Sequence, residues 1–164
     1  MNKIRKDIWI KTLVCLVLVG LVIASGCVEK APKELTITEI IFCSEEPSER
    51  DYEIQPDATY RAGDTIWMYV EASEFDSRKL NGEYEVHISL SMDLLDADGN
   101  VLKHWPSLHE FHGDKLKRIP DYIWFTEYIY GTDVFESGKY TVSMTFTDRI
   151  SMQGKTVRGD FYIE

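Results

Sequence analysis

Regular alternation of apolar and polar residues is the feature of this sequence that most constrains its fold. From Tyr140 to Thr147 every second residue is apolar, and the same alternation runs from Val86 to Leu94. Successive side chains of a β-strand point to opposite faces, so a period of two indicates antiparallel strands with one face against a core. No window of about 11 residues beyond position 34 shows the helical period instead.

Turn residues separate the alternating stretches. Asp98-Gly99 lies between two apolar runs and is a hairpin signal, because both residues tolerate positive φ. The predicted strands are 35–43, 65–73, 84–95, 101–111 (interrupted by Pro106), 121–130, 139–148 and 156–163. This number of short strands without a crossover helix predicts an all-β antiparallel sandwich over residues 35–164. Residues 44–62 form a long acidic connection with room for a short edge strand at 52–54.

The first 27 residues have the composition of an export signal. A basic segment precedes an apolar run from Thr12 to Ala24, which leads through Ser25 and Gly26 to Cys27. This order is typical of a secretory signal, and the basic residues remain on the cytoplasmic side. We therefore expect a membrane partner for the N-terminal segment and an extracytoplasmic location for residues 28–164. The polar stretch 28–34 predicts a short tether.

The residues Ala24-Ser25-Gly26-Cys27 resemble the lipobox of prokaryotic lipoprotein signals, with Ala24 at the position where that family usually has leucine. The resemblance implies that residues 1–27 are a signal with lipid attached at Cys27. An uncleaved N-terminal anchor helix and full secretion are the alternatives. All three place the remaining chain outside the cytoplasm.

The charge balance excludes one class of partner. The formal net charge is −10, and without residues 1–27 the chain carries 14 Lys and Arg against 27 Asp and Glu. Phosphate binding needs clustered basic residues, so no nucleic acid is expected as a partner. Cys43 is the only cysteine after Cys27, so no disulfide forms within residues 28–164. Cys43 ends an apolar run and is expected to be buried and inert.

Two segments resemble parts of immunoglobulin-like domains. Residues 136–142 (ESGKYTV) are similar to the start of strand F, where a tyrosine hydrogen-bonds back to the chain two residues before the second cysteine. Residues 63–70 (GDTIWMYV) resemble strand B, which carries the first cysteine. Val70 and Val142 stand at the two cysteine positions. The resemblance therefore implies an Ig-like sandwich in which apolar packing replaces the disulfide, and it implies nothing about activity.

Metal-ligand residue types are concentrated in the stretch 104–114. It contains His104, His109, His112 and Asp114. On an extended strand His109 and His112 face opposite sides, and their spacing is not that of the helical zinc motif. We expect a polar hairpin end here, with an exported metal-binding domain as the alternative. The spacing of Asp96 to Asn100 does not fit a calcium loop and predicts a turn.

Catalytic motifs are absent from the sequence. It contains no Gly-x-Ser-x-Gly element, phosphate loop or dinucleotide fingerprint. We expect a protein that is not an enzyme and has no cofactor. An exported hydrolase is the alternative, for which the sequence nominates no residues.

Aromatic residues predict a binding surface. In an Ig-like sandwich the strands 65–73 and 121–130 are neighbours, and the alternation directs several of their aromatic side chains outward. The predicted patch consists of Trp67, Tyr69, Tyr122, Trp124 and Tyr128. Such patches mark contact surfaces, so we expect a binding or scaffolding module for a cell-surface protein or another surface ligand. The alternative is a set of cross-strand aromatic pairs covered by the 44–62 connection.

Overall fold

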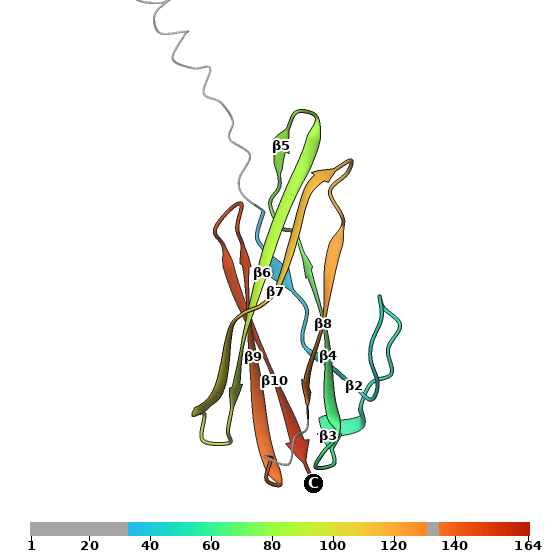
Figure 1. Ribbon diagram of the computed structural model, residues 1–164, viewed down its shortest axis with the longest axis vertical. Helices are drawn as coiled ribbons and strands as arrows, with labels where there is room; N and C mark the ends of the chain where they lie inside the picture. The colour runs from blue at the N-terminus through green and yellow to red at the C-terminus, as the bar shows by residue number, and fades with distance from the viewer. Residues whose placement is uncertain (1–32, 131–134) are drawn as a thin grey trace, which may run out of the picture. The chain divides into compact units, whose positions relative to one another are not determined.

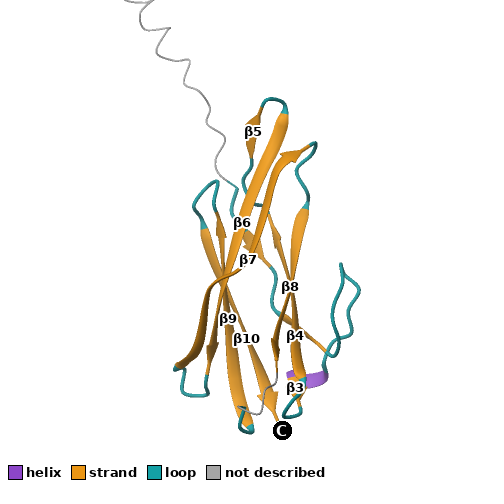
Figure 2. Ribbon diagram, in the orientation of Figure 1, coloured by secondary structure: helices purple, strands orange, loops and turns teal. Residues whose placement is uncertain are grey.

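Two β-sheets around a common core make up the described part of the protein, which in this computed structural model comprises residues 33–130 and 135–164 (Figure 1). The helical element in this part is one 3-10 turn, η1 (Pro56–Ala58), drawn in purple in Figure 2. No helix within these two ranges has the length and apolarity to span a membrane. The all-β prediction is confirmed. The predicted signal or anchor, Cys27 and most of the tether lie outside the described residues.

The strand β4 (Thr65–Ser73) is the centre of the first sheet. Strands β1 (Thr36–Ile37) and β2 (Ile41–Cys43) pair with one side of β4, and β8 (Tyr122–Tyr130) pairs with the other side along its whole length. The β4–β8 pair is antiparallel, with Trp67 opposite Tyr128. The prediction that these two strands are neighbours is therefore confirmed.

The second sheet has six strands. Strand β9 (Gly138–Asp148) pairs with β6 (Glu83–Leu95) on one side and with β10 (Gly154–Ile163) on the other. Strand β7 (Val101–Leu116) forms the free edge beside β6, and β5 (Arg78–Leu80) pairs with the first residues of β6. Strand β3 (Thr59–Tyr60) pairs with β10 in parallel. The sequence did not predict β3, because two residues are too short to show an alternation.

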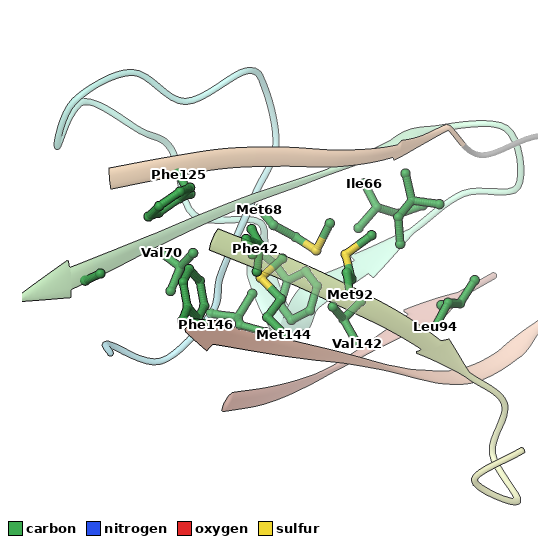
Figure 3. Packing of buried hydrophobic residues seen from close by; sticks show 14 of the residues in the cluster. Phe42, Ile66, Met68, Val70, Met92, Leu94, Phe125, Val142, Met144 and Phe146 are labelled. Atoms are coloured by element: carbon green, nitrogen blue, oxygen red, sulfur yellow. The ribbon is translucent and has the colours of Figure 1, made fainter. Parts of the chain in front are cut away.

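The core lies between the sheets and consists of the residues that the alternation places inward. From the second sheet Val86, Ile88, Leu90, Met92, Val142, Met144 and Phe146 are buried, and Ile66, Met68, Val70 and Phe125 face them from the first. Figure 3 labels eight of these side chains meeting between the strands: Met92, Val142, Met144 and Phe146 from the second sheet and Ile66, Met68, Val70 and Phe125 from the first. Phe146 packs edge-on against Phe125 with ring centroids 5.3 Å apart. Each such aromatic side chain contributes roughly 1.5–3 kcal/mol by burial.

One inward position of β10 has no side chain, and a neighbour fills it. A Cβ atom at Gly159 would lie 2.8 Å from Cε2 of Phe42 and 3.2 Å from Cβ of Ile40. The Phe42 ring therefore uses the space that a side chain at Gly159 would occupy. Its centroid lies 5.8 Å from that of Phe161, two residues further along β10. Glycine at this position lets the β2 end of the first sheet approach β10 closely.

The entry to β9 forms a hydrogen-bonded corner. The Tyr140 hydroxyl donates to the carbonyl oxygen of Glu136, four residues earlier, at 3.0 Å. Val142 follows two residues later and is fully buried, as is Val70 on β4. Cys43 is also fully buried, as expected, and burial raises the pKa of its thiol to about 11.

The edge strand β7 is longer than predicted and continues through Pro106. Met92 pairs with Trp105 and Leu90 with His109. Paired positions that are two residues apart on β6 are therefore four residues apart on β7. This bulge contains Pro106, whose missing amide hydrogen is tolerated because β7 has a strand on one side alone. Figure 1 shows β7 and β8 close together where the 117–121 loop joins them and diverging toward their other ends.

Candidate functional site

Aromatic side chains gather on the outer face of the first sheet, toward the end where β8 finishes. The ring centroids of Trp67 and Tyr128 are 5.1 Å apart, and those of Tyr128 and Tyr130 are 4.7 Å apart. Trp124 and Tyr128 are each 43% exposed and Tyr130 is 64% exposed. Trp124 and Tyr128 are the accessible members of the predicted patch, and Tyr130, which the sequence analysis did not include, extends it.

The 44–62 connection covers the rest of the predicted patch. Tyr69 is only 1% exposed, so its place in an exposed patch is a wrong prediction. Its ring packs on Tyr52 at 4.9 Å, and its hydroxyl accepts a hydrogen bond from the Arg50 amide and donates one to Glu71. Desolvation therefore raises the pKa of Tyr69. The sequence left open the alternative that the 44–62 connection covers the aromatic residues. This alternative is correct for Tyr69.

Tyr122 is held by the same connection. The Arg50 guanidinium lies 3.8 Å from the centre of the Tyr122 ring, and the Tyr122 hydroxyl donates to a carboxylate oxygen of Glu49 at 2.6 Å. Tyr122 is half-buried as a result. Together, Tyr69 and Tyr122 fix the connection onto the sheet and are structural residues.

A groove of about 920 Å³ opens between the diverging parts of β7 and β8. Its aromatic walls are Trp105 of β7, Tyr128 and Tyr130 of β8, Phe135, and Tyr140 of β9. The aliphatic lining consists of Leu94, Leu102, Leu108 and Ile129. Tyr128 and Tyr130 belong to both the groove and the exposed patch, so the two surfaces are continuous. The volume is that of a site for a drug-sized molecule.

A buried carboxylate, Glu127, lines this groove. Glu127 lies on the inward face of β8 between Phe125 and Ile129 and is 7% exposed. Its Oε1 accepts a hydrogen bond from Nδ1 of His109 on β7 at 3.0 Å. Its Oε2 forms no hydrogen bond with any described residue. Burial raises the pKa of Glu127, an effect that the His109 imidazole opposes.

Charged groups around the groove are mostly acidic. Asp96 and Glu136 line it in addition to Glu127, and the basic group in its lining is Lys103. The Asp96 carboxylate accepts hydrogen bonds from the side chain and backbone of Asn100 and from the backbone of Asp98, and these bonds lower the Asp96 pKa. They also confirm the predicted turn there. The Lys103 ammonium lies 4.7 Å from the centre of the Trp105 ring.

The histidines of the stretch 104–114 do not come together, as the alternative of a metal-binding domain would require. His104 pairs with Asp93 and His112 with Glu85 on the outer face of the second sheet, whereas His109 reaches Glu127. The residues opposite His104 and His112 are six apart on β6, a separation of roughly 20 Å. Asp114 is exposed. No group of three or more metal-ligating side chains occurs within 33–130 and 135–164. The alternative of a metal site built from His104, His109, His112 and Asp114 is therefore wrong.

The fourth histidine, His87, was missed by the sequence reasoning. Its ring stacks on that of His112 with centroids 4.4 Å apart, and it pairs with Glu110. Glu85 joins His112 to Arg78 through hydrogen bonds of 3.2 and 2.9 Å. Arg78 and His112 both lower the pKa of Glu85. This network has satisfied partners and holds β5, β6 and β7 together.

The groove residues Trp105, Tyr130, Phe135 and Tyr140 were also missed. They lie on three strands and a loop, so no single run of sequence groups them. A signal was present for Glu127, because it is the one charged residue on an otherwise apolar face of its strand. A charged side chain at such a position requires a partner or a function.

Comparisons with known proteins find a shared fold. No family model matches the chain, and no curated protein does. The structure is similar to the C-terminal domain of wzt, with TM-score 0.50, 9% identity, and coverage of 80% of this chain and 74% of that one. It is also similar to a family 123 glycoside hydrolase from Clostridium perfringens (TM-score 0.47, 10% identity, 79% and 27% covered).

An immunoglobulin-like protein from Pseudomonas aeruginosa gives a TM-score of 0.33 at 16% identity, with 82% of this chain and 99% of that one covered. The likeness to the wzt domain concerns the fold alone at its level of identity. The other two TM-scores are too low to support an argument.

Proposed function

We propose that this protein is a non-catalytic binding module with an Ig-like β-sandwich, held at the outer side of a cell membrane by its N-terminal segment. The binding surface is the groove between β7 and β8, whose lining includes the exposed ring of Tyr128. The partner is a cell-surface protein or another ligand met outside the cytoplasm. The groove is the observation that carries this proposal.

Three features support the Ig-like assignment. The Tyr140 hydroxyl bonds back to the Glu136 carbonyl, as the corner tyrosine of such domains does. Val70 and Val142 are buried where those domains carry their cysteines. The aromatic strand β4 pairs with β8, as strand B pairs with strand E.

Support for the location comes from the sequence. A basic segment, an apolar run and Ser25-Gly26-Cys27 stand in the order of a lipoprotein signal. The acidic domain that follows would be repelled by anionic headgroups, so lipid at Cys27 or an apolar anchor supplies the attachment.

Support for a non-catalytic role comes from the state of the reactive side chains. Cys43 is fully buried, and with its pKa raised to about 11 it remains a thiol at neutral pH. The stacked histidines on the second sheet are each paired with a carboxylate on an open face rather than in a cleft. The groove, by contrast, combines aromatic walls with few polar groups, which is the composition of binding sites.

The test is a ligand-binding screen on the full chain in a non-ionic detergent. Saturation-transfer NMR is run with a library of small amines, carboxylates, sugars and neutral aromatics. The groove variant carries Leu102→Ser and Tyr130→Ser, which alter side chains that are 54% and 64% exposed and should leave the fold intact. The matched control is Trp124→Ser on the outer face.

We expect at least one class of molecule to bind the wild type and to lose most of its signal with the groove variant. Binding that survives in the groove variant and is lost in Trp124→Ser would assign the function to the flat patch instead. A library in which no class binds would overturn the proposal of a binding groove.

A further inference from the structure

We propose that the groove between β7 and β8 binds a small organic cation, with Glu127 as its counter-ion and the aromatic walls around its charged group. This inference rests on the proposed function and names the class of ligand. It follows from the burial of Glu127, the rings that share its groove, and the charge of the surroundings.

The first observation is a buried carboxylate that has a hydrogen-bond partner for only one of its two oxygens among the described residues. Glu127 is 7% exposed and its single described partner, His109, occupies Oε1 alone. A buried carboxylate is costly unless a cation or several donors stabilise it. Oε2 has no hydrogen bond with a described residue and belongs to a side chain that lines the groove. A cationic ligand would supply the missing partner.

The second observation is the set of rings. Trp105, Tyr128, Tyr130, Phe135 and Tyr140 line the same groove. The face of an aromatic ring attracts cations, most strongly for Trp and next for Tyr. One of these rings already does so, because the Lys103 ammonium lies 4.7 Å from the Trp105 centroid. The groove therefore accepts a cation from its own chain when no ligand is present.

The third observation is the electrostatic balance. The lining contains one basic residue, Lys103, and three acidic ones, Asp96, Glu127 and Glu136. The remainder of the chain beyond residue 27 is acidic as well. An anionic ligand would be repelled, and a neutral one could donate a hydrogen bond to Glu127 but would leave its charge without a counter-ion. A cation is attracted at long range and paired at short range.

The experiment compares ligand pairs of similar size and shape in which one member is cationic and the other neutral. Choline is measured against its carbon analogue, in which a tert-butyl group replaces the trimethylammonium. Glucosamine is measured against glucose. Titrations use the full chain in a polyoxyethylene ether detergent, which has neither charge nor sugar. We expect the cation of each pair to bind about tenfold more tightly than its neutral partner.

Two variants with matched controls place the effect at the groove. Glu127→Gln keeps the size of the side chain and should reduce the affinity for the cation to that for the neutral analogue. Glu110→Gln removes the same charge from the outer face of the second sheet and should change the ratio little. Lys103→Met removes the competing ammonium and should raise cation affinity severalfold, whereas Lys117→Met, at the other end of β7, should not.

Several results would overturn this inference. Equal binding of the cationic and neutral members of both pairs would do so, as would weaker cation binding in Lys103→Met. Tighter binding of glucose, lost in the Leu102→Ser and Tyr130→Ser variant, would keep the binding function and reject the cation. Absence of binding by every ligand would reject both.

Discussion

Two glutamates on paired strands of one sheet illustrate how position sets the role of a residue. Glu127 points inward, and burial raises its pKa. Glu71 points outward, and hydrogen bonds from Arg50 and Tyr69 lower its pKa. A shifted pKa is a difference in proton binding between the folded and unfolded chain, so these two residues affect stability in opposite senses.

Glu127→Gln should stabilise the protein at neutral pH. The unfolded glutamate ionises near pH 4.3, while the folded one holds its proton to higher pH. Glu127 therefore lowers the free energy of unfolding as pH rises from about 4.3 through its raised folded pKa. Urea denaturation of the full chain at several pH values should show a gain for the variant at pH 7 that vanishes below about pH 4. A loss of stability at pH 7 would mean that the pair with His109 stabilises the fold.

Glu71→Gln is the control with the opposite sign. The folded carboxylate ionises at lower pH than the unfolded one, so its stabilisation is present above about pH 4.3 and is lost as pH falls through the lowered pKa. The variant should be less stable than the wild type at pH 7 in the same urea titrations. The difference should disappear in acid. A constant difference across pH would assign the loss to packing.

Strand β9 provides the clearest test of an element. Phe146 is fully buried, and its inward neighbours on the strand are Met144 and Val142. Phe146→Ala should lower the free energy of unfolding by about 3–5 kcal/mol, because it leaves a cavity against Phe125. Thr145→Ala on the outward face should change it by less than about 0.5 kcal/mol. Similar losses for the two variants in denaturant titrations would contradict the register.

Most strands could be predicted because the alternation of apolar and polar residues is visible within each strand's own sequence. The range 65–73 agrees with β4 at both ends, and β6, β8 and β9 differ from prediction by a single residue at one end. The inward residues of these strands were predicted correctly because one polar face excludes the other register. The predicted range 101–111 ends before β7 does, at Leu116, and the predicted interruption at Pro106 is a bulge within this edge strand.

The candidate site was less predictable, because it depends on distances between elements. The aromatic residues of β8 were identified, but the sequence could not show that the 44–62 connection would bury Tyr69 and leave Trp124 exposed. Trp105 and Glu127 line one groove from two different sheets, and no local pattern encodes the divergence of β7 from β8. His104, His109 and His112 are close in sequence, but each pairs with a different carboxylate, because strand pairing and not sequence distance places their side chains.

At the scale of the whole molecule, attachment to the membrane is the property to test. If lipid is attached at Cys27, the full chain should partition into the detergent phase when a cell extract is warmed above its cloud point. Cys27→Ala should move the protein out of that phase or leave it unprocessed. An intact N-terminus at Met1 in protein extracted from membranes would reject the lipobox and support an uncleaved anchor.

The valines at positions 70 and 142 have a consequence for how the protein matures. Cys43 is the one cysteine among the described residues, and it is free and fully buried. Folding of the two sheets therefore includes no thiol oxidation or isomerisation step, a step that takes seconds to hours where it occurs. The domain needs neither an oxidant nor a disulfide isomerase at its destination. It can reach the same folded state in a reducing environment as in an oxidising one.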